Sequence, residues 1–214
     1  MTHHLRGQNQ DTRCPCCGLP KGLCVCALAP RLDIRTEFII VSHAKEMRRA
    51  SNTARLAQLV MPGTRILLRG IKDRPIPPGE LERQGAAMFV LFPADDAVEI
   101  DAALIRSLDR PLVIVVPDGS WRQAASAIRR EEGLRGLTRL KLPKGPESRY
   151  VLRTQPSPGK VSTFEAIARV VGVVEGLEKQ RALEAYLDEM VRRSLVASGN
   201  QARARLLDWH GEPD

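Results

Sequence analysis

Short apolar runs recur along the chain and alternate with longer segments of helical periodicity. The runs are rich in β-branched residues and bounded by turn residues, which is typical of buried strands. We expect strands at residues 37–42, 64–68, 87–92, 112–116 and 138–142. Because helical patterns separate these runs, the sequence predicts an α/β domain with a largely parallel sheet flanked by helices.

The segments between the strands predict helices. Ser120 with Gln123, and Ser162 with Glu165, have capping-box spacing, in which a side chain accepts a hydrogen bond from the amide three residues later. Acidic residues favour the positive end of a helix, which places a helix start in the acidic run after residue 95. The expected helices cover residues 45–60, 79–84 and 95–108, begin at 120 and at 162, and cover 177–194.

The fourth expected strand leads directly into candidate chemistry. It is followed by Asp118 and Gly119, a turn pair, and then by the capped helix that begins with Ser120 and Trp121. An acid, a hydroxyl and an indole therefore come at the carboxyl end of a buried strand, where open α/β sheets form ligand crevices. The other interpretation of this segment is an ordinary turn with a core indole.

A second polar group follows the first expected strand. His43, Glu46, Arg49, Asn52 and Thr53 follow the order H-x-x-E-x-x-R-x-x-N-T, and a helix here would place Glu46, Arg49 and Thr53 on one face. Taken singly, an exposed ion pair and a strand-end histidine account for most of these residues. The ordered set favours a site.

Residues 142–158 form a proline-rich, basic connection that holds Arg149, Tyr150 and Arg153. A long loop inside a compact domain is usually functional or disordered. Basic side chains suit phosphate contacts, and a tyrosine can stack on a base or pack in a core.

All five cysteines lie near the N-terminus. Cys14 and Cys17 form a C-x-x-C, and Cys24 and Cys26 form a C-x-C seven residues later, with Cys16 to spare. Four thiolates from two short turns can surround one tetrahedral Zn²⁺, and such closed sites are structural. A redox pair or incidental cysteines are the alternatives.

Charge and composition point to a polyanionic partner. The 214 residues carry a formal charge of +8, and only 4% are aromatic, which disfavours wide base-stacking platforms. No run approaches the roughly 20 apolar residues of a membrane span, and residues 1–13 lack the apolar core of a secretory signal. We expect a cytoplasmic protein with nucleic acid, not membrane, as its partner.

The chain divides into three expected parts: a zinc knuckle at 1–30, an α/β domain at 31–195 and a basic tail at 196–214. Neither a dinucleotide-binding G-x-G-x-x-G after the first strand nor a P-loop motif is present, which disfavours both of those classes.

Five ordered blocks resemble the DTW-domain family. They are the four cysteines, the H-x-x-E-x-x-R-x-x-N-T segment, Asp118-Gly119-Ser120-Trp121, Ser148-Arg149-Tyr150-x-Leu152-Arg153 and Ser162-Thr163-x-Glu165-Ala166. Ser120 stands where the family name expects threonine, and it preserves the hydroxyl. The family's fold is similar to that of SPOUT methyltransferases, whose C-terminal part carries a deep trefoil knot, so a knot is one outcome that the resemblance allows.

The resemblance implies a bacterial tRNA-uridine aminocarboxypropyltransferase. Such enzymes transfer the 3-amino-3-carboxypropyl (acp) group of S-adenosylmethionine to N3 of a tRNA uridine, which yields acp3U and releases methylthioadenosine. Three alternatives stay open: a zinc-knuckle RNA-binding protein without catalysis, an RNA methyltransferase that uses the same cofactor, and an rRNA-directed acp-transferase. The oligomeric state is not predicted.

The resemblance also implies roles for individual residues. Asp118 is the candidate catalytic residue, either as the base for the N3 proton or as the partner of the cofactor's ammonium group. The cofactor's carboxylate is expected at the amides of residues 162–165. The cofactor-site candidates are Asp118, Ser120, Trp121, Leu142, Pro143, Ser162, Thr163 and Glu165. The RNA-contact candidates are Arg49, Arg149, Tyr150 and Arg153, and His43, Glu46, Asn52 and Thr53 are expected to line the site.

Overall fold

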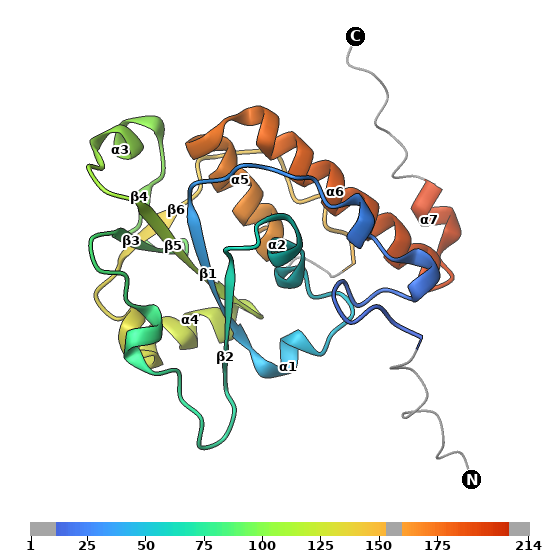
Figure 1. Cartoon of the computed structure of the whole chain (residues 1–214), viewed down its shortest axis with the longest axis horizontal. Helices are drawn as coiled ribbons and strands as arrows, with labels where there is room; N and C mark the ends of the chain where they lie inside the picture. Colours follow the sequence, from blue (N-terminus) through green and yellow to red (C-terminus); the bar gives the residue numbers. More distant parts are fainter. Residues whose placement is uncertain (1–11, 153–159, 206–214) are drawn as a thin grey trace.

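A six-stranded sheet organises the computed structural model, which describes residues 12–152 and 160–205 (Figure 1). The order across the sheet is β2-β1-β5-β3-β6-β4, and every neighbouring pair is parallel. The strands are β1 (Glu37–His43), β2 (Arg65–Arg69), β3 (Ala87–Leu91), β4 (Val98–Glu99), β5 (Leu112–Asp118) and β6 (Thr138–Lys141). The predicted α/β class with a parallel sheet is confirmed. The knot stays a prediction of the resemblance.

Helices cover both faces of the sheet, and strand alternation divides the core accordingly. Phe38 and Ile40 of β1 join the larger core, whereas Ile39 and Val41 join the smaller one. The larger core is covered by α2 (Ala54–Val60), α5 (Thr163–Glu175) and α6 (Leu177–Ala197), and the smaller by α4 (Trp121–Arg130), η3 (Pro78–Leu81) and η4 (Glu132–Leu134). Figure 1 shows α5 and α6 side by side along one side of the sheet.

The single helix expected at residues 45–60 is wrong. Two helices, α1 (Ala44–Met47) and α2, flank a turn instead. The Asn52 side chain accepts a hydrogen bond from the amide of Ala54 at 3.0 Å, and its backbone amide donates to the Arg49 carbonyl at 3.1 Å. Asparagine competes with helix continuation in this way, because its side chain offers a nearby backbone amide an alternative acceptor.

The helix expected at residues 95–108 is shorter than predicted. Val98 and Glu99 form β4, which pairs in parallel with β6. Helix α3 (Ala102–Ser107) begins only after Asp101, whose carboxylate accepts a hydrogen bond from the amide of Leu104 at 2.7 Å. Residues 98 and 99 thus pair with β6 instead of joining the helix that the acidic residues favour.

The described parts of both expected end segments, residues 12–30 and 196–205, pack on the larger core. Cys17, Leu19 and Val25 are buried there, beside η1 (Lys21–Leu23) and η2 (Cys26–Leu28). Helix α6 extends past residue 195, and Ala204 of α7 (Gln201–Arg205) is 4% exposed. The three-part division stays a prediction, with its first and last parts sharing one core with the middle. Within the described residues, no helix has the length and apolar character of a membrane span.

Candidate active site

Two adjoining cavities open at the carboxyl edge of the sheet, where β1, β3, β5 and β6 end. Parallel strands present their carboxyl ends at one edge, which is where α/β sheets bind ligands. The larger part of the predicted site gathers here, around Asp118 at the end of β5.

Asp118 is buried, and its carboxylate joins three separate segments. One oxygen accepts hydrogen bonds from the Ser42 hydroxyl at 2.5 Å and from the Asn52 amide group at 2.9 Å. The other accepts from the Thr163 hydroxyl at 2.6 Å. Three of its roughly four lone-pair positions are therefore filled by side chains. The carboxylate fixes the end of β1, the α1–α2 turn and the start of α5 relative to one another.

The first cavity is apolar and has a volume of about 460 Å³. It lies over the ends of β3, β5 and β6, with Leu91, Val116 and Leu140 among its lining residues. Leu142 and Pro143, two of the predicted cofactor-site residues, also line it. Its volume falls in the usual range of pockets for small molecules and cofactors, about 300–1,000 Å³.

The second cavity is polar and has a volume of about 660 Å³. It lies between the α1–α2 turn and the start of α4. The structure brings most of the predicted site residues together here: Glu46, Arg49, Asn52, Thr53, Asp118, Ser120, Trp121, Tyr150, Ser162 and Thr163.

A wall shared by both cavities separates the two spaces. It consists of Gly119, Trp121, Val161, Ser162 and Thr163. The Trp121 ring has two close neighbours. The centroids of the Trp121 and Phe92 rings are 5.8 Å apart, and the Lys160 ammonium lies 4.7 Å from the Trp121 ring centroid. Trp121 is therefore not a core residue: it is half-buried and forms part of the wall between the two cavities.

Both capping boxes are confirmed, and the one at the start of α5 occupies amides that were expected to hold a carboxylate. The Glu165 side chain accepts from the Ser162 amide at 2.7 Å, and the Ser162 hydroxyl accepts from the Glu165 amide at 3.3 Å. The Phe164 amide donates to the Thr53 hydroxyl at 3.3 Å. Three of the four amides in this turn thus already have protein acceptors.

Glu165 lies behind the cavities and braces the neighbouring loop. It is 5% exposed and accepts from the Ser148 hydroxyl at 2.7 Å and from the Arg149 amide at 2.8 Å. The loop in turn places Tyr150, whose hydroxyl donates to the Ser51 carbonyl. Glu165 therefore shapes the site through the loop and does not line either cavity.

Three other predicted residues lie outside the cavities or the described residues. The His43 ring packs against Gly70 and caps α1, and burial, assisted by Arg69 and Lys45, lowers its pKa. Arg149 pairs with Asp188 of α6 at 2.9 Å. Arg153 lies outside the residues that the structure describes.

Sequence reasoning missed four basic residues that line the cavities. Arg122, the residue after Trp121, is exposed on the polar cavity, whereas Lys141, Lys144 and Arg169 line the apolar one. Nothing in the sequence around Arg122 distinguishes it from the other arginines of its helix. Only the position of α4 beside the α1–α2 turn brings it to the site.

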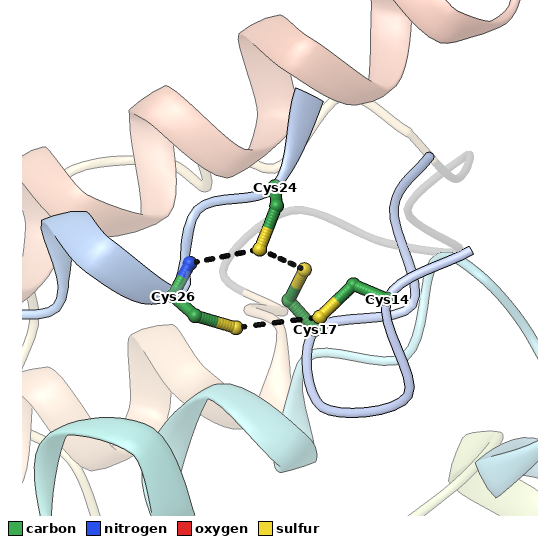
Figure 2. Close-up of side chains that lie close together, drawn as sticks. All are labelled: Cys14, Cys17, Cys24 and Cys26. Atoms are coloured by element: carbon green, nitrogen blue, oxygen red, sulfur yellow. Dashed lines mark hydrogen bonds between the residues drawn. The ribbon is translucent and has the colours of Figure 1, made fainter. Parts of the chain in front are cut away.

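The four predicted metal-ligand cysteines converge on one point (Figure 2). Their sulfur atoms all lie within 4.8 Å of one another, with 3.6 Å between Cys14 and Cys26 and 3.7 Å between Cys17 and Cys24. A tetrahedron with Zn–S bonds of about 2.3 Å has edges of about 3.8 Å. The cluster therefore has the geometry of a four-thiolate metal site.

The thiols of this cluster differ in acidity. A hydrogen bond from the Cys17 backbone amide is the main cause that lowers the pKa of Cys14 to about 6. Burial, and then the neighbouring thiols, raise the pKa of Cys26. Crowded buried thiols gain most from a cation, since a bound metal ion favours the thiolate form.

The fold and the divided crevice define an α/β ligand-binding protein with a basic rim. The family model of the DTW domain matches residues 11–195, and the chain therefore belongs to the DTW domain family.

Three similar proteins are informative. The chain is 28% identical over 180 residues to tRNA-uridine aminocarboxypropyltransferase 2 of Drosophila melanogaster, covering 81% of this chain and 70% of that protein. It is 30% identical over 217 residues to tRNA-uridine aminocarboxypropyltransferase A of Arabidopsis thaliana, covering 84% and 79%. A solved structure, the SAM-dependent rRNA acp-transferase Tsr3 of Vulcanisaeta distributa, aligns with 81% of this chain and 89% of that chain, with a TM-score of 0.45 and 15% identity.

Proposed function

We propose that this chain transfers the acp group of S-adenosylmethionine to N3 of a uridine in tRNA. The observation that carries the proposal is the divided crevice, in which an apolar cavity of cofactor size meets a polar, basic cavity at a wall built from Asp118's neighbours. Membership of the DTW family and the names of its relatives support the same reaction.

The apolar cavity is the proposed cofactor site. S-adenosylmethionine supplies a sulfonium flanked by three carbons, of which the reaction uses the acp carbon. An N3–carbon bond forms, the carbon–sulfur bond breaks with its electrons on sulfur, and the N3 proton is lost. Orientation decides which of the three carbons reacts. The wall must therefore direct the acp arm toward the polar cavity, and its residues best placed to do so are Trp121, Ser162 and Thr163.

The polar cavity is the proposed RNA site. Its two acids, Glu46 and Asp118, are buried, whereas Arg49 has 59% of its side chain exposed and Arg122 is exposed as well. The exposed arginines at such an opening attract the phosphate backbone of RNA. The buried carboxylates beneath them can accept a hydrogen bond from a nucleobase.

Asp118 acts in this proposal mainly as a positioning residue. Its oxygens already accept three hydrogen bonds, which leaves little capacity for an N3 proton or for an ammonium group. Glu46 is the other carboxylate on the polar cavity and the alternative acceptor of that proton.

The cysteine cluster is proposed to hold one structural Zn²⁺ through Cys14, Cys17, Cys24 and Cys26. Four thiolates complete a tetrahedral shell and leave no position for a substrate, which separates the metal from the chemistry.

Mass spectrometry of the products tests the proposed reaction. With purified protein, S-adenosylmethionine and total tRNA that lacks the modification, we expect acp3U in the nucleosides and methylthioadenosine as the small product. S-adenosylhomocysteine would indicate methyl transfer, and acp-uridine formed only on rRNA would move the substrate to that RNA. Cofactor and RNA binding without any product would contradict catalysis.

Arg122→Ala should raise KM for tRNA several-fold and leave the Kd for S-adenosylmethionine unchanged. Loss of one phosphate contact should lower the slope of log Kd for tRNA against log salt by about 1. Arg129→Ala is the matched control, because Arg129 is exposed on the same helix but lines neither cavity. An unchanged slope in Arg122→Ala, or an equal change in both variants, would contradict a phosphate contact at Arg122.

A further inference from the structure

Arg55 lies between the cysteine cluster and the polar cavity, and it lines neither of the two proposed binding cavities. It belongs to the first turn of α2 and is half-buried. Its Nη2 atom donates a hydrogen bond to the carbonyl of Met47, the last residue of α1. Its Nη1 atom lies against Gly18, directly after the first cysteine pair.

Two features of Gly18 bear on this contact. Gly18 has a φ of +80°, and its amide donates to the Cys14 carbonyl at 2.9 Å, which closes the turn of the first cysteine pair. A Cβ atom at Gly18 would also lie only 2.6 Å from Arg55 Nη1. The guanidinium thus occupies the space that a side chain would fill and packs directly on the cysteine turn.

The contact with Met47 reaches the polar cavity. The turn that follows Met47 supplies Arg49, Ser51 and Asn52 to this cavity. Asn52 donates to Asp118 at 2.9 Å, and the Ser51 carbonyl accepts from Tyr150. A shift at Met47 would therefore displace the part of the polar cavity's lining that this turn supplies.

One nitrogen of the Arg55 guanidinium is enclosed. Arg55 Nε is buried and has no hydrogen-bond partner among the described residues. A buried donor without a partner is destabilising, so any stability that the guanidinium contributes comes from its two terminal contacts.

We propose that Arg55 is a positioning residue that holds the α1–α2 turn against the folded cysteine turn, so that the RNA side of the site depends on the cysteine cluster. The apolar cavity does not share this dependence, because its lining residues come from β3, β5, β6, α4, α5 and the loops beside them, not from the α1–α2 turn. The kinetic part of the inference rests on the proposed function, whereas its structural part rests on the contacts alone.

Arg55→Ala tests both parts. We expect KM for tRNA to rise at least tenfold, with the Kd for S-adenosylmethionine within twofold of the parent. Hydrogen exchange should become faster in the peptide that covers residues 47–53, where the Asn52 amide is now bonded to the Arg49 carbonyl. Removal of metal by a chelator should accelerate exchange in the same peptide.

A glycine pair supplies the matched control. Gly18 and Gly85 have φ values of +80° and +73°, so alanine strains the backbone at both, but a Cβ at Gly85 has open space around it. Gly18→Ala should reproduce the exchange pattern of Arg55→Ala, whereas Gly85→Ala should only lower stability.

Two results would overturn the proposal: unchanged exchange at 47–53 in Arg55→Ala, or a rise in the Kd for S-adenosylmethionine that matches the rise in KM for tRNA. If the parent protein transfers nothing to tRNA, the proposed function fails, and the exchange experiment still decides the role of Arg55.

Discussion

Asp118→Asn should lower the rate of acp transfer by at least about 100-fold and also weaken cofactor binding and the fold. Asparagine keeps the size of the side chain but turns one of its two acceptor atoms into a donor. That donor must face the Ser42 and Asn52 donors or the Thr163 hydroxyl. A buried donor without a partner costs about 1–3 kcal/mol. A misplacement of about 1 Å in the reacting groups can cost about 100-fold in rate.

Urea unfolding, calorimetry with S-adenosylmethionine and single-turnover kinetics measure the three effects separately. Asp101→Asn is the matched control, since Asp101 caps α3 outside both cavities and asparagine is an equally good cap. If Asp118→Asn unfolds at the parent's urea concentration and binds the cofactor normally while its rate collapses, Asp118 is the base and the positioning role is wrong.

Cys17→Ser should abolish zinc binding and destabilise the whole domain. Cys17 is 2% exposed and belongs to the same core as Leu19, Val25 and Phe164. Structural zinc in finger peptides contributes an apparent 10–16 kcal/mol to folding, so loss of the metal should cost several kcal/mol here. Because the cysteine turns pack on the main core, we expect one cooperative transition at lower urea, not separate melting of the N-terminal segment.

Metal analysis of the purified protein and urea unfolding check this result. The parent should contain about one zinc ion per chain and Cys17→Ser about none, as four protein ligands define one closed site. Cys16→Ser is the control, because Cys16 is exposed and lies outside the cluster. Zinc retained in Cys17→Ser, or equal loss in both variants, would contradict the proposed ligand set.

Local signals predicted much of this molecule. The five expected strands, both capping boxes and the gathering of the four cysteines depend on residues close together in the chain, and all of them form as expected. The metal that these cysteines would bind stays a proposal. The helix error at 95–108 has a nonlocal cause, whereas the error at 45–60 combines a local bond between Asn52 and Ala54 with a nonlocal bond to Asp118. Bonds from Asn52 and pairing of β4 with β6 override the local helical pattern.

Roles of single residues were harder to predict than the site itself. Glu165 and Tyr150 were expected at the cofactor and the RNA, respectively. Glu165 braces a loop from behind the cavities, while Tyr150 lines the polar cavity with its hydroxyl bonded to a carbonyl. Arg122 was overlooked. A motif identifies a region, but the neighbours of each side chain decide whether it binds, braces or caps.

The segment around Asp118 shows most clearly what the sequence determines and what the tertiary structure adds. The sequence by itself determined a buried strand, a turn and a capped helix, because apolar patterning and capping are local properties. Only the tertiary structure decided what Asp118 does. Its three donors come from residues 42, 52 and 163, which lie far apart in the chain and meet because parallel strands end at one edge of the sheet.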